Sequence, residues 1–108
     1  MPKFGGAPMG GANMMKQMQK MQQDMLKAQA DIEAREFTGT SGGGAVKAVA
    51  GGDRFLRSLV VAPDAIDPDD AEMLQDLIVT AVNEALKTAE DAMTSVMQRF
   101  TGGLNLPF

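Results

Sequence analysis

The chain has 108 residues, enough for one domain with a small core. It contains no Cys and no His, which excludes disulfides, thiolate nucleophiles, imidazole bases and every metal site that needs those ligands. No apolar run reaches the roughly 18 residues of a membrane span, and no signal-peptide pattern opens the sequence. Composition therefore predicts a cytoplasmic, non-enzymatic protein with no cofactor, no metal, no membrane partner and no small-molecule substrate.

The net charge of −4 is distributed unevenly along the sequence. Residues 1–30 contain four Lys and one Asp, residues 31–57 are balanced, and residues 58–108 contain nine acidic and two basic side chains. The N-terminal part is therefore positive and the C-terminal half is strongly negative. Such a molecule can present a basic surface to an anionic partner although its overall charge is negative.

The first predicted element is a long helix. Residues 1–12 are rich in Gly, Pro and Ala and are expected to form a flexible arm. Residues 13–35 contain no Gly or Pro and consist mainly of good helix formers, with Asn13 as the N-cap. The apolar positions follow the 4-3-4-3-4 spacing of a coiled-coil seam, which keeps one face toward a partner helix. These positions are Met14, Met18, Met21, Met25, Ala28 and Ile32.

Residues 36–61 change to short apolar runs separated by glycines, which predicts three antiparallel strands joined by glycine hairpins. The glycine-rich residues 38–44 could also suggest a phosphate-binding loop. They lack the Lys-Ser/Thr ending and do not open a helix, so a hairpin turn is favoured. In the third strand both faces are partly apolar, and we expect the sheet to be covered on both sides. Simple alternation places Phe55, Leu59 and Val61 on one face and Leu56 and Val60 on the other.

A second long helix is predicted from Asp67, as an acidic cap, with Pro68 in the first helical position. It should continue to about Phe100, where Gly102 and the glycine after it stop it. Six acidic side chains between residues 64 and 76 could suggest a site for a hard metal ion, but capping and solubility explain them without a metal. Residues 102–108 are expected to be a flexible tail, so the folded domain comprises residues 13–101.

Helix length indicates a homodimer. Helices of about 23 and about 32 residues span roughly 35 Å and nearly 50 Å, whereas a compact chain of this size has a radius of gyration near 13 Å. The apolar stripes of both helices would project into water unless a second copy covered them and extended the sheet. The interface is expected to contain Met18, Met21, Met25, Phe37, Val46, Val49, Phe55, Leu59, Val61, Leu74, Leu77 and Ile78.

A basic stripe lies opposite the methionine seam of the first helix. Lys16, Lys20, Gln23 and Lys27 share this face with 4-3-4 spacing, and no aromatic side chain lies near them in the sequence. This composition suits contact with a phosphate backbone better than stacking on bases. The alternative is an ordinary solvated helix face.

Three blocks of the sequence, at residues 15–22, 38–47 and 72–85, resemble the YbaB/EbfC family of nucleoid-associated DNA-binding proteins. The resemblance covers almost the whole chain, and a Gly-rich tail ending in Leu-Pro-Phe also matches. It implies an α+β protein with α-β-β-β-α order, in which long helices flank a three-stranded meander. It further implies a tweezer-shaped homodimer that binds double-stranded DNA in the nucleoid and has an architectural or gene-regulatory role.

Carried over to this chain, the resemblance assigns DNA contacts to lysines in the matching run and to basic residues that correspond only by position on the helices. The first group is Lys16 and Lys20, and the second is Lys27, Lys87 and Arg99. The main alternative is a prefoldin-like chaperone or protein-interaction module that holds apolar clients with its Met-rich helices. For a prefoldin the helices are short, and three strands are expected in place of one hairpin.

Overall fold

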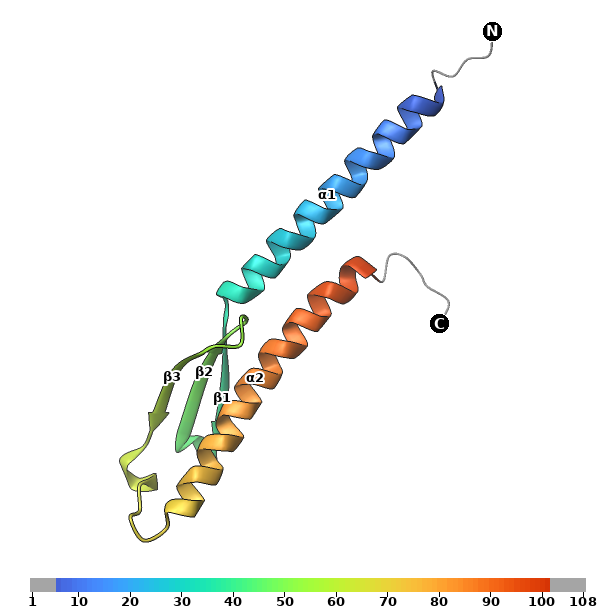
Figure 1. Cartoon of the computed structure of the whole chain (residues 1–108). Helices are drawn as coiled ribbons and strands as arrows, with labels where there is room; N and C mark the ends of the chain where they lie inside the picture. The colour runs from blue at the N-terminus through green and yellow to red at the C-terminus, as the bar shows by residue number, and fades with distance from the viewer. Residues whose placement is uncertain (1–5, 102–108) are drawn as a thin grey trace, which may run out of the picture.

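The computed structural model describes the backbone of residues 6–101 and the side chains of residues 13–100. Within these residues the order is α-β-β-β-α, which confirms the predicted fold class (Figure 1). Two short 3₁₀ turns, Gly42–Gly44 and Pro63–Ala65, connect strands and helix. The main elements are α1 (Gly6–Ala34), β1 (Glu36–Ser41), β2 (Val46–Gly51), β3 (Leu56–Val61) and α2 (Ala71–Thr101).

The three strands form one antiparallel sheet in the order β1-β2-β3, and α2 lies across β1 and β2. Alternate side chains of β2 point toward this helix, and Val46, Ala48 and Ala50 are fully buried. They meet Ala81 and Ala85, two alanines one helical turn apart on α2. The main core is therefore built from small side chains, which allow the helix to lie close to the sheet.

Gly39 in β1 marks the closest approach of the sheet to α2. A Cβ atom added there would overlap the carbonyl oxygen of Ala81 and would lie 2.5 Å from the amide nitrogen of Ala85. Both atoms belong to the backbone of α2, so they cannot move aside as a flexible side chain could. Only glycine fits at this position without moving α2.

A second cluster joins the base of α1 to the C-terminal half of α2. Ile32 of α1 packs with Phe37, Ala89 and Val96, all of them buried. The N-terminal part of α1 extends beyond the end of α2 (Figure 1). The radius of gyration is 22.7 Å and the molecule measures 89 × 28 × 16 Å. Both helices were expected to project beyond the core; α1 does so, whereas α2 packs along the sheet and against the base of α1.

The structure corrects the predicted start of both helices. Residues 6–12, expected in a flexible arm, belong to α1. Pro8 is compatible with this helix because it falls in the first turn, where backbone N–H groups have no partner within the helix. Helix α2 begins at Ala71 and not at Pro68: the carboxylate of Asp70 accepts a hydrogen bond from the Met73 amide at 3.2 Å. The Asp67 carboxylate instead accepts from the Asp69 amide at 2.9 Å, which forms a turn before the helix. Residues 1–5 and the predicted tail, residues 102–108, lie outside the described part.

A β-bulge changes the faces of β3. The register shifts between Val49 and Ala50, so Leu56 pairs with Ala50 while Leu59 pairs with Ala48. Residues paired across antiparallel strands point to the same face, so Leu56 and Leu59 both face the α2 side. The simple alternation that separated Leu56 from Leu59 was wrong, because it assumed an unbroken ladder.

Within one chain, α2 covers only one face of the sheet. On the opposite face Val60 is 59% exposed, and Lys47 is exposed beside it. The expected coverage of both faces is therefore not present in the single chain.

Candidate nucleic-acid interface

The lysine face of α1, defined by Lys16, Lys20 and Lys27, lies on the part of the helix that leads away from the sheet. All three side chains are exposed. A helix rises 1.5 Å per residue, so they span about 16 Å along one side. None of them takes part in the ion pairs found among the described side chains. Their charges are thus available to an external anion.

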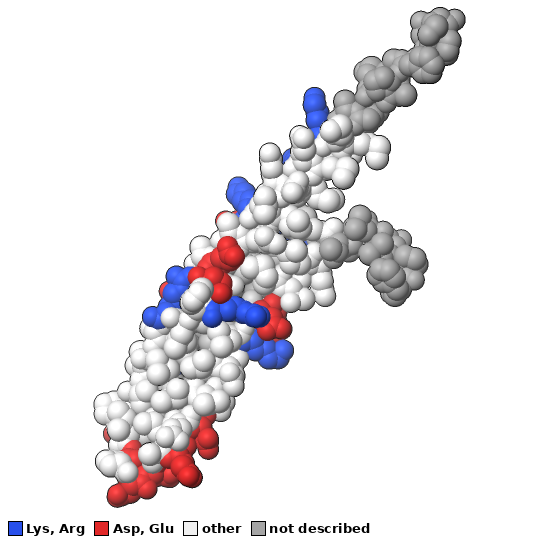
Figure 2. Space-filling view, in the orientation of Figure 1, with Lys and Arg blue, Asp and Glu red and all other residues white. Residues whose placement is uncertain are grey.

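The opposite end of the molecule is acidic. Figure 2 shows acidic side chains gathered at the end where α2 begins, and basic side chains along the projecting helix. The acidic end contains Asp64, Asp67, Asp69, Asp70, Glu72 and Asp76. The uneven charge of the sequence becomes a separation in space, which favours an anion at the α1 end.

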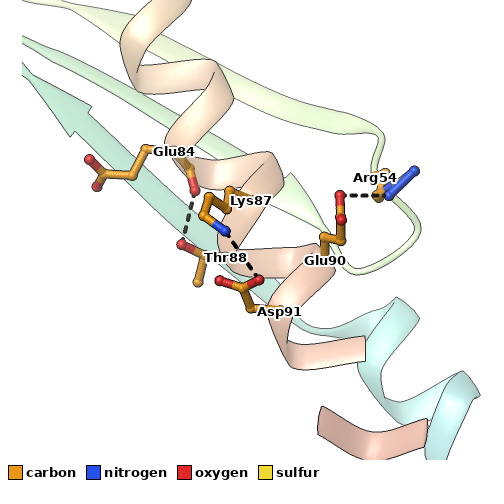
Figure 3. A network of polar contacts seen from close by, with 6 residues as sticks. All are labelled: Arg54, Glu84, Lys87, Thr88, Glu90 and Asp91. Atoms are coloured by element: carbon orange, nitrogen blue, oxygen red, sulfur yellow. Dashed lines mark hydrogen bonds and ion pairs between the residues drawn. The ribbon is translucent and has the colours of Figure 1, made fainter. Parts of the chain in front are cut away.

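Lys87 occupies a different environment. Its Nζ lies 3.5 Å from Oδ1 of Asp91, and Glu84 and Glu90 belong to the adjacent turns of α2 (Figure 3). Glu90 also pairs with Arg54, which reaches α2 from the β2–β3 turn, at 3.1 Å (Figure 3). Among the described side chains Lys87 is paired with Asp91, and this neighbouring negative charge weakens its attraction for a phosphate.

Arg99 stands in the last turn of α2 and is exposed. Because α1 and α2 run in opposite directions and pack through their inner ends, this turn lies beside α1, on the basic side of the molecule (Figure 1). Of the two basic residues assigned on α2, Arg99 is therefore the nearer to α1, although α2 packs on the seam side of α1 and not on the lysine face.

The side chains expected at a dimer interface fall into three groups. Met18, Met21, Phe55 and Leu59 are exposed. Phe37 and Val46 are buried inside the single chain, at 6% and 0% exposure, so they stabilise the fold and offer no surface to a second copy. The half-buried group is Met25, Val49, Val61, Leu74, Leu77 and Ile78.

The two edges of the sheet differ. At β1 the amide of Thr40 donates to Oε1 of Glu84 at 3.3 Å, and α2 packs along this strand. At β3 the side chains of Leu56 and Leu59 are 46% and 39% exposed, although they face the helix side of the sheet. An edge strand with exposed apolar side chains is a surface for pairing with another chain.

Helix α2 adds apolar surface next to this open edge. Glu84 marks the side of α2 that faces β1, and Val82 and Leu86 lie on the other side of the buried alanines, toward β3. Both are half-buried and pack on the core. Leu56, Val82 and Leu86 were not among the residues predicted for an interface, and the register of the bulge was needed to place Leu56 on this exposed apolar surface.

Within residues 6–101, no helix is long and apolar enough to span a membrane. The described residues also contain no group of three or more acidic side chains arranged to hold a metal ion. Before α2, the Asp67 carboxylate forms a turn with the Asp69 amide and the Asp70 carboxylate caps the helix.

Fold and charge together define an elongated α-β-β-β-α protein whose basic helix stands apart from its core. The model of the YbaB/EbfC DNA-binding family matches residues 8–104, and the chain belongs to this family. This confirms the resemblance seen in the sequence. The expectation of a non-enzymatic protein agrees with a family that is named for DNA binding.

Two relatives show how far the similarity extends. A nucleoid-associated protein of Clostridium novyi (strain NT) is 52% identical, with 95% of each chain covered. A nucleoid-associated protein of Pelotomaculum thermopropionicum is 54% identical over 92% of this chain and 96% of the relative. A crystal structure of an uncharacterized protein from Helicobacter pylori has a TM-score of 0.69 and 19% identity, covering 83% of this chain and 95% of that chain. It supports the fold alone.

Proposed function

We propose that this protein is a nucleoid-associated homodimer that binds double-stranded DNA through phosphate contacts from α1, with an architectural or gene-regulatory role. The observation that carries the proposal is the lysine face: three exposed lysines on a projecting helix of a chain that belongs to a DNA-binding family. The relatives named as nucleoid-associated proteins support its location in the nucleoid.

Phosphate contact fits the lysine face better than base readout. Lysine is a compact charge that neutralises a phosphate without selecting a base, whereas reading base edges commonly uses bidentate Arg, Asn or Gln. The face spans about 16 Å, comparable with several successive phosphates of one strand. Binding should therefore depend weakly on DNA sequence and strongly on charge.

The open edge of β3 supports the homodimer. A two-fold axis beside β3 would bring the same strand from two copies together and would cover Leu56 and Leu59 with their own counterparts. Such a dimer carries two α1 helices and therefore six lysines of the lysine face. It leaves β1 outside, where Glu84 and α2 already close the edge.

Charge reversal on α1 tests the DNA-binding proposal. The triple variant Lys16→Glu, Lys20→Glu and Lys27→Glu should remain a dimer but lose its mobility shift on a DNA duplex, because like charges now repel the backbone. The matched control is Lys47→Glu, an exposed lysine on the sheet, which should bind within about twofold of the unmodified protein. Unchanged binding by the triple variant would show that α1 is not the contact surface.

A further inference from the structure

The methionine seam of α1 is covered at its base and exposed toward its N-terminal end. Ala28 and Ile32 pack in the cluster that joins α1 to α2. Further along the same face, Met21 is 48% exposed, Met18 is 68% exposed and Met14 is 64% exposed. We call Met14, Met18 and Met21 the methionine ridge. It continues, as exposed apolar surface, the face of α1 on which α2 packs.

Helix α2 stops before it reaches the ridge. The Gln29 amide nitrogen donates to Sδ of Met97 at 3.1 Å, and the two helices run in opposite directions (Figure 1). Thr101, the last residue of α2, lies four residues beyond Met97. It therefore stands near the level of Met25, four residues before Gln29 on α1. On the N-terminal side of Met25, the seam is clear of α2 and open to another helix.

The side chains that flank the ridge are compatible with a second copy of the same helix. Gln17 and Asp24 lie along one side of the seam, and Met15 and Gln22 lie along the other. Like charges at such flanking positions keep identical helices apart, but only Asp24 is charged here. An open hollow of about 580 Å³ beside the ridge can receive side chains of another helix. It is lined by Met15, Met18, Gln19, Met21, Gln22 and Met25.

From this pattern we infer that the ridge packs against the ridge of a second copy, so that α1 of one homodimer joins α1 of another. The two helices run antiparallel, because α2 occupies the seam at the base of each α1 and a parallel pair would bring the two α2 ends together. Methionine side chains adapt to each other and fill irregular gaps in such a contact. The contact is separate from the edge of β3 that supports the homodimer.

The pairing gives the protein a way to hold two DNA duplexes at once. The lysine face lies on the side of α1 opposite the ridge, and Figure 2 shows basic side chains along one edge of the projecting helix. When two ridges meet, their lysine faces point away from each other across two helix thicknesses, about 20 Å. Each face can then contact a different duplex. This step rests on the proposed DNA binding, whereas the pairing of the ridges does not.

The size of the contact indicates when the ridges pair. From Met14 to Met25 the open seam is about 16 Å long, and a helix is about 10 Å wide. Such a strip is far smaller than the roughly 800 Å² that each partner buries in a stable complex. The homodimer therefore predominates in dilute solution. Ridges pair where many dimers lie close together on DNA, because their effective concentration is high there.

Capture of one duplex by another tests the inference on DNA. One duplex is fixed to beads, and the protein is added with a second, labelled duplex. The ridge variant, Met14→Gln, Met18→Gln and Met21→Gln, keeps good helix formers and all the lysines. It should bind a single duplex within about twofold of the unmodified protein but retain at least about tenfold less labelled duplex, because the avidity of paired arms is lost. Met73→Gln, at an exposed position in the first turn of α2, should bridge normally.

Bridging by the ridge variant at the normal level would overturn the inference and assign bridging to the homodimer itself. If the unmodified protein does not bind a single duplex, the proposed function fails, and the ridge is then tested without DNA. Since the chain contains no cysteine, one engineered thiol reports on one position.

Thiol cross-linking of concentrated protein without DNA tests the ridge contact by itself. The variant Met18→Cys, treated with a short bis-maleimide, should form a cross-linked pair of chains, whereas Met73→Cys should not. The cross-link should persist when Leu56→Lys and Leu59→Lys are added, because the ridge is separate from β3. A missing cross-link at Met18→Cys would overturn the inference and leave the ridge to an apolar client protein. A cross-link that is lost with the β3 substitutions would overturn the separate contact.

Discussion

At the scale of single residues, the packing of α2 on the sheet depends on the absence of side chains. Gly39 faces the backbone of Ala81 and Ala85, and the side chains that β2 buries in the main core are those of Val46 and two alanines. The main core contains few large groups, so its stability rests on close approach more than on the burial of bulky side chains. Even a small increase in side-chain volume in this core should therefore destabilise the fold.

The substitution Gly39→Ala should destabilise the fold by about 3 kcal/mol, at the upper end of overpacking effects, because the added methyl group meets rigid helix backbone. Denaturant unfolding of the purified protein measures the loss. Thr38→Ala, at an exposed neighbouring position in the same strand, is the control and should cost less than about 1 kcal/mol. Equal stability of Gly39→Ala and the unmodified protein would contradict the close contact between β1 and α2.

Single residues also explain why the sequence predicted the glycine turn correctly but misplaced the start of α2. The glycines at residues 42–44 have positive φ angles, as their hairpin requires, so glycine content located this turn. The start of α2 was misplaced because Asp67 and Asp70 are both good caps by composition. Only the folded chain decides between them: the Asp67 carboxylate binds the Asp69 amide, and the Asp70 carboxylate binds the helix.

At the scale of elements, the two edges of the sheet have different roles. The edge at β1 is closed by Glu84 and α2, while β3 exposes Leu56 and Leu59 on its helix side. The bulge between β2 and β3 creates this apolar pair, because it brings Leu56 to the face of Leu59. Period-two alternation predicts strands but cannot locate a bulge, so the sequence alone assigned Leu56 to the wrong face.

The double variant Leu56→Lys and Leu59→Lys should convert the proposed dimer into a monomer. Lysines on both strands would face each other across the two-fold axis, and their repulsion would oppose pairing. Sedimentation velocity measures the change in mass. Val60→Lys, on the opposite face of β3, is the matched control and should weaken the dimer less. A double variant that remains fully dimeric would place the interface elsewhere, since both leucines are exposed in the single chain.

At the scale of the whole molecule, positive and negative side chains are separated along the long axis. The chain is 89 Å long, with lysines along the projecting helix and carboxylates at the far end (Figure 2). The net charge of −4 alone would argue against an anionic partner. The spatial separation removes that objection, because DNA held at the α1 end avoids the acidic end.

The sequence predicted this separation of charge well. Basic and acidic side chains already lie in different parts of the sequence, and the long helices carry these parts to opposite ends of the molecule. Helix spacing also placed the lysines opposite the methionine seam. What the sequence could not predict was that Phe37 and Val46 are buried by α2 in the same chain, although both looked suitable for an interface. Apolar strand residues have the same pattern whether a helix of their own chain or a second copy covers them.

The salt dependence of DNA affinity tests the central claim most directly. If the dimer neutralises about six phosphates with the lysine faces of its two α1 helices, log K should fall with log salt concentration at a slope near −5. Fluorescence anisotropy on a labelled duplex across a salt series, with the dimer verified by sedimentation at each concentration, gives this slope. A steep slope near that value is the result we expect. Affinity that does not change with salt would contradict binding through phosphate contacts.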